Sequence, residues 1–266
     1  MVIALVGIVC PLDGNFHYFH ECQETHSDPN AFSCNAPRFL LNELSENDRK
    51  RKDANISTTV LTGCARAYAL KKTRPWFINL NHGWNMARGT WAHAMFEKGK
   101  YGPEYLIEQR LSKALDVRGA LRYITGKPDE VNMRDGILID YKTKHTIPTS
   151  VSFDHEAQFN TYVWLLNGGR VITRGKHFQQ EINVEITRGG MHYVSWQPKV
   201  PWRRIKVDIW DNDSTEWWLI SRITPIAEWE DTGILPECNR MVTYGKCDCM
   251  DLETTHHQFW KDQGII

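Results

Sequence analysis

The octapeptide GILIDYKT, residues 136–143, joins a buried strand to two charged side chains. Residues 137–139 form the continuous apolar run typical of a buried strand. Charge is costly in such surroundings unless it is paired or bound to a metal. Because side-chain direction repeats every second residue of a strand, Asp140 and Lys142 point to the same face. The pair therefore indicates a site where an acid and an ammonium group act together.

The chain around this stretch alternates between helix-like and strand-like patterns. Apolar residues at helical spacing predict helices over residues 36–44, 57–68, 152–166 and 215–230, and over residues 86–98 between the breakers Gly83 and Gly99. Patterns typical of strands occupy residues 104–115, 119–133, 181–190, 191–196 and 204–210, and a tight turn over residues 134–136 leads into the octapeptide. This order predicts an α/β fold with a mixed central sheet flanked by helices.

The length of 266 residues is enough for one large domain with additions. We expect an N-terminal extension over residues 1–53 and the main domain over residues 54–266. The 32 basic and 32 acidic residues balance, so binding to nucleic acid requires a local groove rather than a general positive field. The opening MVIALVGIVC is too short to cross a bilayer and lacks a leading positive region. These features predict a soluble intracellular protein with no membrane partner.

Side chains suited to metal-dependent chemistry follow one another along the chain. They are His93, Asp129, Asp140 with Lys142, and Gln158 with Tyr162. Each has an ordinary alternative, since a helical histidine often packs, an aspartate after a proline often makes a turn, and residues four apart are neighbours on any helix. Together, the two carboxylates suit Mg²⁺ or Mn²⁺, and the imidazole favours a site that accepts Mn²⁺. Lys142 would orient the attacking water or stabilise charge on the phosphate.

This ordered set resembles the PD-(D/E)xK nucleases of the RecB type, in particular the CRISPR-associated RecB-like exonucleases and their phage and archaeal relatives, over roughly residues 55–250. The resemblance implies a restriction-endonuclease-like core. It further implies that metal is bound by His93, Asp129, Asp140 and the Tyr141 carbonyl, and that Lys142 is catalytic. By the same resemblance Gln158 and Tyr162 contact DNA and brace the site, and Glu108 supports it.

Seven unevenly spaced cysteines suit metal or cluster ligation better than a disulfide framework, although several of them can equally be buried apolar residues. The resemblance implies a 4Fe-4S cluster that joins a helical C-terminal lobe to the core through Cys64, Cys238, Cys247 and Cys249. The final C-x-C pair departs from the C-x-x-C pair typical of the family. Zinc at the same four cysteines is therefore the alternative. A separate zinc site in the extension would draw on Cys10, Cys22, Cys34, His17 and His20, whereas His256 and His257 are expected to be exposed.

Basic and aromatic residues suggest where a nucleic-acid strand would lie. They are Arg66, Lys71, Lys72, Arg74, Trp76, Trp202, Arg203 and Arg204. Positive charge attracts the backbone and aromatic faces stack on bases, a mode suited to single strands. The sequence thus predicts a metal-dependent exonuclease acting on single-stranded DNA, with possible protein partners in recombination, repair or CRISPR adaptation. The alternatives are an endonuclease or flap-processing repair nuclease, and a non-catalytic subunit that binds DNA ends.

Overall fold

The computed structural model describes residues 5–10, 13–25, 38–49, 55–99, 101–195, 202–238 and 247–266. The chain divides into two compact units. Unit 1 comprises Met1–Asp53, Cys64–Thr90 and Ile234–Ile266, and unit 2 comprises Ala54–Gly63 and Trp91–Gly233. Residues 1–53, expected as a separate extension, thus share unit 1 with two segments of the expected main domain.

Unit 2 contains two five-stranded mixed sheets. The first, here the β6–β7 sheet, has the order β11 (Glu181–Asn183), β10 (Asn167–Val171), β6 (Leu111–Val117), β7 (Ala120–Gly126), β3 (Ile56–Ser57). The second, here the β9–β12 sheet, has the order β13 (Trp202–Lys206), β12 (Arg188–Ser195), β9 (Ile137–Lys144), β8 (Glu130–Asn132), β5 (Tyr105–Ile107). A mixed α/β fold is therefore confirmed, although the strands form more than one sheet.

The octapeptide forms β9, as its apolar run predicts. It pairs antiparallel with β8 and parallel with β12, where Lys142 lies opposite Tyr193. The predicted turn before β9 is also present, because the Asn132 side-chain oxygen accepts hydrogen bonds from the amides of Arg134 and Asp135. Gly136 then takes a φ of 61°, which favours glycine. The pairing on both sides places Asp140 in the middle of a sheet.

Replacing Gly136 by alanine is expected to lower the free energy of unfolding by more than the ~1–2 kcal/mol that left-handed backbone costs a residue with a Cβ. The added atom would also meet the carbonyl oxygen of Glu185. Gly119→Ala is the matched control, because Gly119 has a φ of 78° and no heavy atom within 4 Å of an added Cβ. Urea unfolding measures both variants, and an equal loss in the two would contradict the close packing at Gly136.

Two stretches predicted as single strands are each two strands in different sheets. Residues 104–115 contain β5 and β6, and residues 119–133 contain β7 and β8. The first break falls at Glu108, whose φ is 50°. The second falls near Pro128, which has no amide hydrogen for a ladder. Conversely, β12 runs through residues 190 and 191, where two strands were predicted to meet.

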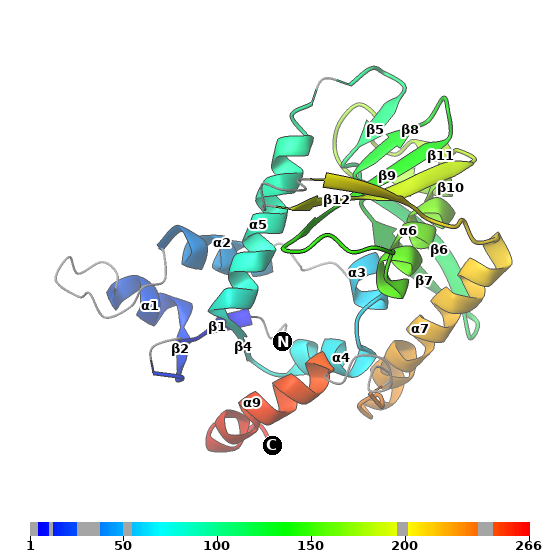
Figure 1. Ribbon diagram of the computed structural model, residues 1–266. Helices are drawn as coiled ribbons and strands as arrows, with labels where there is room; N and C mark the ends of the chain where they lie inside the picture. The colour runs from blue at the N-terminus through cyan, green and yellow to red at the C-terminus, as the bar shows by residue number, and fades with distance from the viewer. Residues whose placement is uncertain are drawn as a thin grey trace. The chain divides into compact units, whose positions relative to one another are not determined.

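The helices of unit 2 are α3 (Thr58–Leu61), α6 (Phe153–Leu166) and α7 (Asn212–Thr232). Helix α6, predicted over residues 152–166, packs against both sheets, with Leu165 beside Gly126 of β7 and Phe159 beside Gly189 of β12 (Figure 1). The predicted helix from residue 57 is interrupted after α3, which Ser57 caps by accepting a hydrogen bond from the Val60 amide. Helix α6 therefore contacts both the sheet that contains β9 and the other sheet of unit 2.

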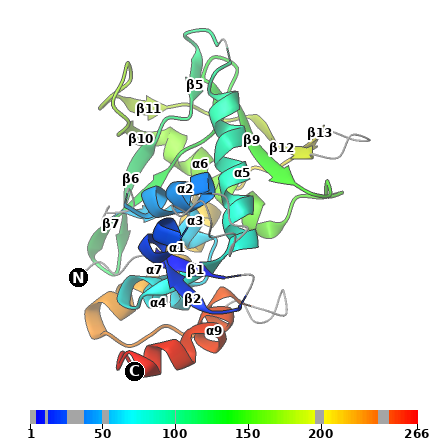
Figure 2. The same cartoon turned by 90° about the vertical axis from the view of Figure 1, so that its left-hand side faces the viewer.

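Unit 1 contains the mixed sheet β2 (Phe16–Tyr18), β1 (Leu5–Val9), β4 (Trp76–Asn79). Its helices are α1 (Phe19–Thr25), α2 (Arg38–Arg49), α4 (Ala65–Thr73), α9 (Asp248–Asp262) and, up to Thr90, α5 (Leu80–Phe96). Helices α4 and α9 lie side by side in Figure 2. Among the helices that the structure describes, none combines the length and the apolar character needed to span a bilayer.

Two local predictions in unit 1 are wrong for a packing reason. Gly83 was expected to precede a helix but lies inside α5, where the lack of a side chain makes room for Leu44 of α2. His256 was expected to be exposed but is buried, because its Nε2 accepts a hydrogen bond from the Phe77 amide at 2.9 Å. Phe16 lies against the same imidazole, with ring centroids 5.0 Å apart. His257 is exposed, as expected.

Candidate functional site

Two buried acids of unit 2 converge on His93, near the end of α5. His93 Nδ1 lies 3.0 Å from Glu108 Oε1 and 3.1 Å from Asp129 Oδ1. One ligand atom from each of the three residues lies within 4.8 Å of the other two. Glu108 follows β5 and Asp129 lies between β7 and β8, and both carboxylates are buried. These three residues, here the acid–histidine trio, have the geometry and donor types of a site for a divalent cation.

The backbone around Glu108 and Asp129 holds both carboxylates inward. The Glu108 amide donates to the Asp129 carbonyl at 3.0 Å, and the positive φ of Glu108 is a conformation that glutamate rarely adopts. The Tyr141 amide donates to Asp129 Oδ2 at 2.6 Å. Lys127 pairs with the second oxygen of Glu108. Strained backbone of this kind is typical of functional sites, where the surrounding structure maintains it.

Asp140 and Lys142 occupy the same face of β9, which confirms that prediction. Lys142 Nζ lies 2.8 Å from Asp140 Oδ2, and the Asp140 carboxylate is buried. The other oxygen of Asp140, Oδ1, has no hydrogen-bond partner among the described residues. A buried carboxylate oxygen without a partner is costly. It is the atom through which a bound cation would compensate this carboxylate.

The charges of these groups depend on one another. Burial lowers the pKa of His93, but hydrogen bonds and attraction from Asp129 and Glu108 outweigh burial and raise that pKa to about 9. Burial raises the pKa of Asp140. The positive charge of Lys142 opposes this rise, the negative charge of Asp129 adds to it, and the pKa of Asp140 is about 7. Burial also lowers the pKa of Lys142, yet Asp140 and Asp129 raise it above its ordinary value. Lys142 is therefore an ammonium ion rather than a neutral base.

Metal binding to this site is expected to release a proton at pH 7. His93 carries its proton below about pH 9, and that proton lies between two carboxylates where a cation would bind. A ligating imidazole must be neutral. The affinity for Mn²⁺ should therefore rise by up to about ten-fold for each unit by which the pH increases, until the pH reaches about 9. Titration calorimetry in buffers of different ionisation enthalpy counts the protons. Equal heats in all the buffers would contradict His93 as a ligand, and His93→Gln is the control.

The predicted Gln158 and Tyr162 are brought together on α6 beside the site. The Gln158 amide donates to the Tyr162 hydroxyl at 2.8 Å. Tyr162 is buried, and its pKa is raised by burial and by the charges of Asp140 and Asp129. A buried ring leaves no face for a base to stack on. The predicted contact of Tyr162 with DNA therefore does not fit the geometry, and its predicted bracing role stays a prediction.

A second pair, formed by α6 and β12 beside β9, has no counterpart in the sequence predictions. His155 Nδ1 and the Tyr193 hydroxyl lie 2.8 Å apart, and Tyr193 is fully buried opposite Lys142. Burial, with repulsion from Lys142 and Lys144, lowers the pKa of His155 to about 3. A neutral imidazole is therefore maintained near Lys142. Only the pairing of β9 with β12 brings these residues together, and no local pattern signals it.

Four cysteines predicted as ligands converge in unit 1. The sulfur atoms of Cys64, Cys238, Cys247 and Cys249 all lie within 4.8 Å of one another, and Cys247 and Cys249 are 3.3 Å apart. Burial raises the pKa of the Cys247 thiol to about 11 and also raises that of Cys249. Four converging thiols fit a thiophilic metal or cluster. The unusual C-x-C spacing is compatible with this convergence.

Two helix ends face the four cysteines. Cys64 is the N-cap residue of α4, and Cys247 is the N-cap residue of α9. The positive ends of helix dipoles favour thiolates. Arg66 of α4 adds a positive charge, and it is held by Glu253 of α9 at 2.6 Å and by the Pro236 carbonyl at 3.0 Å. These charges would offset the negative charge that four thiolates bring to one place.

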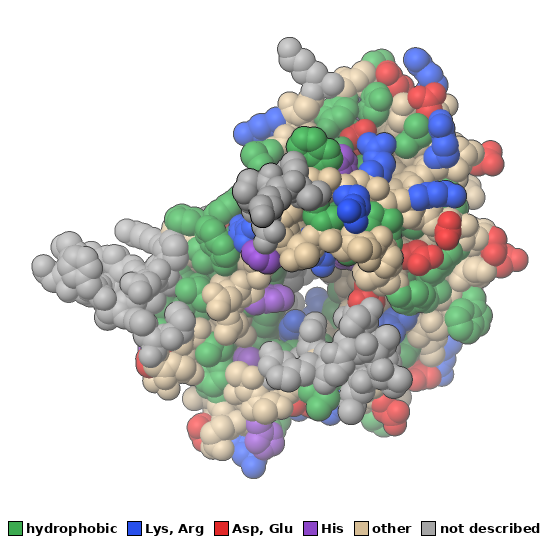
Figure 3. Space-filling view, in the orientation of Figure 1, with side chains coloured by type: hydrophobic (Ala, Val, Ile, Leu, Met, Phe, Trp, Pro, Cys, Tyr) green, Lys and Arg blue, Asp and Glu red, His purple; other side chains and the backbone are tan. Residues whose placement is uncertain are grey.

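The predicted strand-binding residues have different environments. In unit 1, Trp76 is buried under the Lys71 ammonium group, 4.5 Å from its ring centroid, so the prediction that Trp76 stacks on bases is wrong. Arg74 packs on the Trp260 ring at 4.7 Å. In unit 2, Trp202 is 65% exposed on β13, followed by the exposed Arg203 and Arg204. Figure 3 shows lysine and arginine side chains, in blue, over the part of unit 2 that carries β9 and β12.

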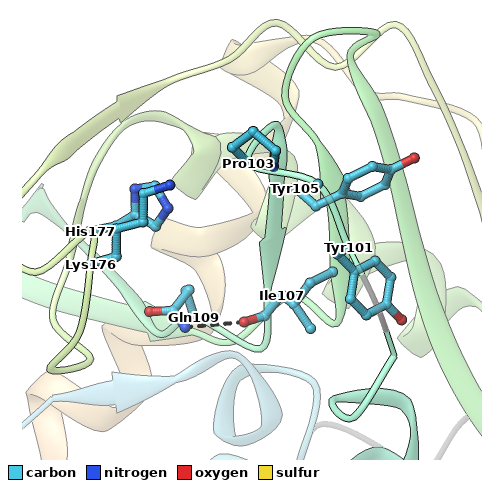
Figure 4. A pocket seen from close by; sticks show the side chains of 8 residues that line it. Tyr101, Pro103, Tyr105, Ile107, Gln109, Lys176 and His177 are labelled. Carbon is cyan, nitrogen blue, oxygen red and sulfur yellow. Dashed lines mark hydrogen bonds between the residues drawn. The ribbon is translucent and has the colours of Figure 1, made fainter.

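A cleft of about 400 Å³ lies at the edge strand β5. Lys176 and His177 line one side of it, and Tyr101 and Tyr105 lie on the opposite side (Figure 4). Ile107 and Gln109, the residues on either side of Glu108, also line it. Burial, then the charges of Glu130 and Glu108, raise the pKa of Tyr101. The cleft therefore joins aromatic with basic groups, and its lining includes both chain neighbours of Glu108.

No family model matches the chain, and no curated protein matches it. A solved structure described as "Crystal structure of SSO0001" is similar to the chain. It is 19% identical, with a TM-score of 0.50, over 70% of this chain and 84% of that chain. At this identity the likeness concerns the fold alone. It supports a shared mixed α/β arrangement.

Proposed function

We propose that this protein is a metal-dependent deoxyribonuclease with a PD-(D/E)xK core, acting as an exonuclease on single-stranded DNA. The observation that carries the proposal is the acid–histidine trio beside the ion pair of the buried Asp140 with the partly buried Lys142. Acids from separate segments, an imidazole and an ammonium group within one buried cluster suit hydrolysis of a phosphodiester. A purely structural cluster would not require an unpartnered carboxylate oxygen in the middle of a sheet.

The residues present fit Mn²⁺ or Mg²⁺. His93, Glu108, Asp129 and Asp140 would hold the ion, and the Tyr141 carbonyl stays a predicted further ligand. When bound, such an ion polarises a phosphate oxygen and makes a bound water more acidic. Lys142 supplies a fixed positive charge for the phosphate, and Asp140 holds the Lys142 ammonium in place at 2.8 Å. Gln158 and Tyr162, hydrogen-bonded to each other on α6, would brace the acids, as the resemblance implies.

Features around the site support a single strand as substrate. Trp202, Arg203 and Arg204 offer an exposed aromatic face beside two cations. The cleft at β5 offers Tyr101 and Tyr105 next to Lys176 and His177. Stacking on aromatic side chains tolerates any base, and cations attract the backbone. Because the total charge is zero, these local groups would supply the attraction.

A cleavage assay with Mn²⁺ tests the proposal. The substrates are a linear single strand labelled at either end, the same sequence closed into a circle, and a flap substrate. Degradation of the linear strand with the circle intact supports an exonuclease. Cleavage of the circle or at the flap junction would instead indicate the endonuclease alternative. Binding of ends without cleavage of any substrate would contradict a catalytic role and favour the end-binding alternative.

Tyr105→Ala is expected to weaken substrate binding at the cleft and leave the chemical step intact. Stacking of one base on an aromatic side chain contributes about 1–3 kcal/mol. We therefore expect KM for a single strand to rise roughly ten-fold or more, with kcat changed little. Tyr105→Phe is the matched control, because it keeps the ring and loses only the hydroxyl that accepts a hydrogen bond from Asn132. Unchanged KM in the alanine variant would exclude the cleft from the substrate path.

A further inference from the structure

A second group of ligand side chains lies in unit 1, on the hairpin formed by β1 and β2. Cys10 follows β1, Asp13 lies in the connecting loop, and His17 is on β2. One ligand atom from each lies within 4.8 Å of the other two. His17 Nε2 and Asp13 Oδ2 are 3.0 Å apart. A sulfur, a nitrogen and an oxygen donor thus meet within eight residues of chain.

Backbone hydrogen bonds maintain this arrangement, and the Asp13 side chain adds one by accepting from the Asn15 amide. The Cys10 amide donates to the Asn15 carbonyl at 2.8 Å, and the Gly14 amide donates to the Cys10 carbonyl at 2.9 Å. Gly14 has a φ of 72°, a conformation that glycine adopts freely. Phe16 anchors β2 by packing on Phe77, with ring centroids 4.8 Å apart. The three donors are therefore held on a preformed turn.

The distance between the His17 and Asp13 donors is compatible with the coordination sphere of a small divalent ion, and the Cys10 sulfur lies within 4.8 Å of both. Zinc binds sulfur at about 2.3 Å and nitrogen or oxygen at about 2.0–2.2 Å, which places neighbouring ligands of a tetrahedron roughly 3–4 Å apart. The 3.0 Å between His17 and Asp13 is close to that range. An exposed histidine–aspartate pair alone contributes little to stability and does not explain a buried thiol beside it.

We propose that Cys10, Asp13 and His17 form a second metal site in unit 1, for Zn²⁺ or a similar borderline cation, with the fourth position open to water or another ligand. Thiolate and imidazole select zinc over Mg²⁺ or Ca²⁺, and one carboxylate completes a donor set that zinc accepts. The site is independent of the proposed nuclease chemistry, which uses other residues in unit 2. A bound ion would join the end of β1, Asp13 and β2 at one point. Of the histidines and cysteines predicted for the extension, His20 and Cys22 are not in the group, and Cys34 lies outside the described residues.

Metal content and Co²⁺ spectroscopy on the full chain test the site. Wild type is compared with Cys10→Ser, with Asp13→Asn, and with His20→Ala as the matched control for an exposed imidazole on α1 nearby. We expect zinc per chain to fall by about one equivalent in Cys10→Ser and to stay unchanged in His20→Ala. Added Co²⁺ should produce a thiolate charge-transfer band that Cys10→Ser weakens, above the contribution of the four-cysteine site present in all the variants.

Asp13→Asn separates metal binding from folding. An asparagine side-chain oxygen can still accept the hydrogen bond that Asp13 Oδ1 receives from the Asn15 amide at 2.8 Å. The loop should therefore persist while a charged ligand is lost. We expect Zn²⁺ to bind this variant at least about ten-fold more weakly, with an unchanged circular dichroism spectrum. Equal zinc content and equal affinity in wild type, Cys10→Ser and Asp13→Asn would overturn the proposal, whatever the nuclease assay shows.

Discussion

Lys142→Met is expected to reduce cleavage of single-stranded DNA by at least about a hundred-fold, because removing one preorganised charge from a reacting group costs roughly 10²–10³ in kcat. Methionine keeps most of the side-chain volume and removes the charge. Asp140 and Asp129 raise the pKa of Lys142, so the native side chain is an ammonium ion throughout the neutral range. The loss should therefore appear in kcat more than in KM.

Lys144→Met is the matched control for this variant. Lys144 lies on β9 two residues further on, and it is exposed, whereas Lys142 contacts Asp140 at 2.8 Å. A general loss of positive charge would affect both variants alike. Because removing Lys142 leaves Asp140 without its ion pair, the thermal midpoint of each variant is measured alongside. Full activity in a folded Lys142→Met protein would refute the catalytic role of Lys142.

Cys249→Ser is expected to destabilise unit 1 more than any other single substitution discussed here. Cys249 is fully buried among the other three thiols, and these come from segments more than a hundred and fifty residues apart in the chain. Binding of a structural metal to such a site is linked to folding. The apparent binding free energy of zinc in small zinc-finger peptides is about 10–16 kcal/mol. Loss of one ligand should therefore expose unit 1 to proteolysis. Cys22→Ser is the control, since it removes a buried thiol outside the quartet.

An absorption spectrum can identify the cofactor that the same four cysteines bind. We propose an iron–sulfur cluster, with a single zinc ion as the alternative at the same thiols. Anaerobic purification followed by an absorption spectrum and an iron count separates the two. Visible absorption with about four irons per chain supports the cluster. A colourless protein with one zinc at these cysteines would support the alternative, and a stable folded protein with neither would contradict the metal-linked folding of unit 1.

The features of the fold and the site that the sequence predicts are those that local sequence patterns determine. The apolar run and the alternation of Asp140 and Lys142 predicted the face they share, and the periodicity of residues 152–166 predicted α6. Sheet membership is not local. Nothing in residues 104–115 indicates that the chain leaves one sheet for another at Glu108, because the positive φ there depends on its contacts with Asp129 and His93.

The same distinction explains which site residues were underestimated. Glu108 was expected only to support the site, yet its carboxylate is as close to His93 as that of Asp129. Lys127 was not predicted to be a site residue, although it pairs with Glu108. Asp13 was not among the ligands expected for the extension, since only a folded hairpin brings it to Cys10 and His17. Tertiary contacts, rather than residue types, identify these groups.

We propose that His93, Glu108 and Asp129 hold a divalent cation beside the Asp140–Lys142 pair. The most direct measurement is the anomalous scattering of Mn²⁺ in crystals of the protein grown or soaked with that ion. We expect a peak in contact with the His93 imidazole and the Asp129 carboxylate, absent from crystals of Asp129→Asn. Crystals with Mn²⁺ bound elsewhere and no peak among these side chains would contradict it.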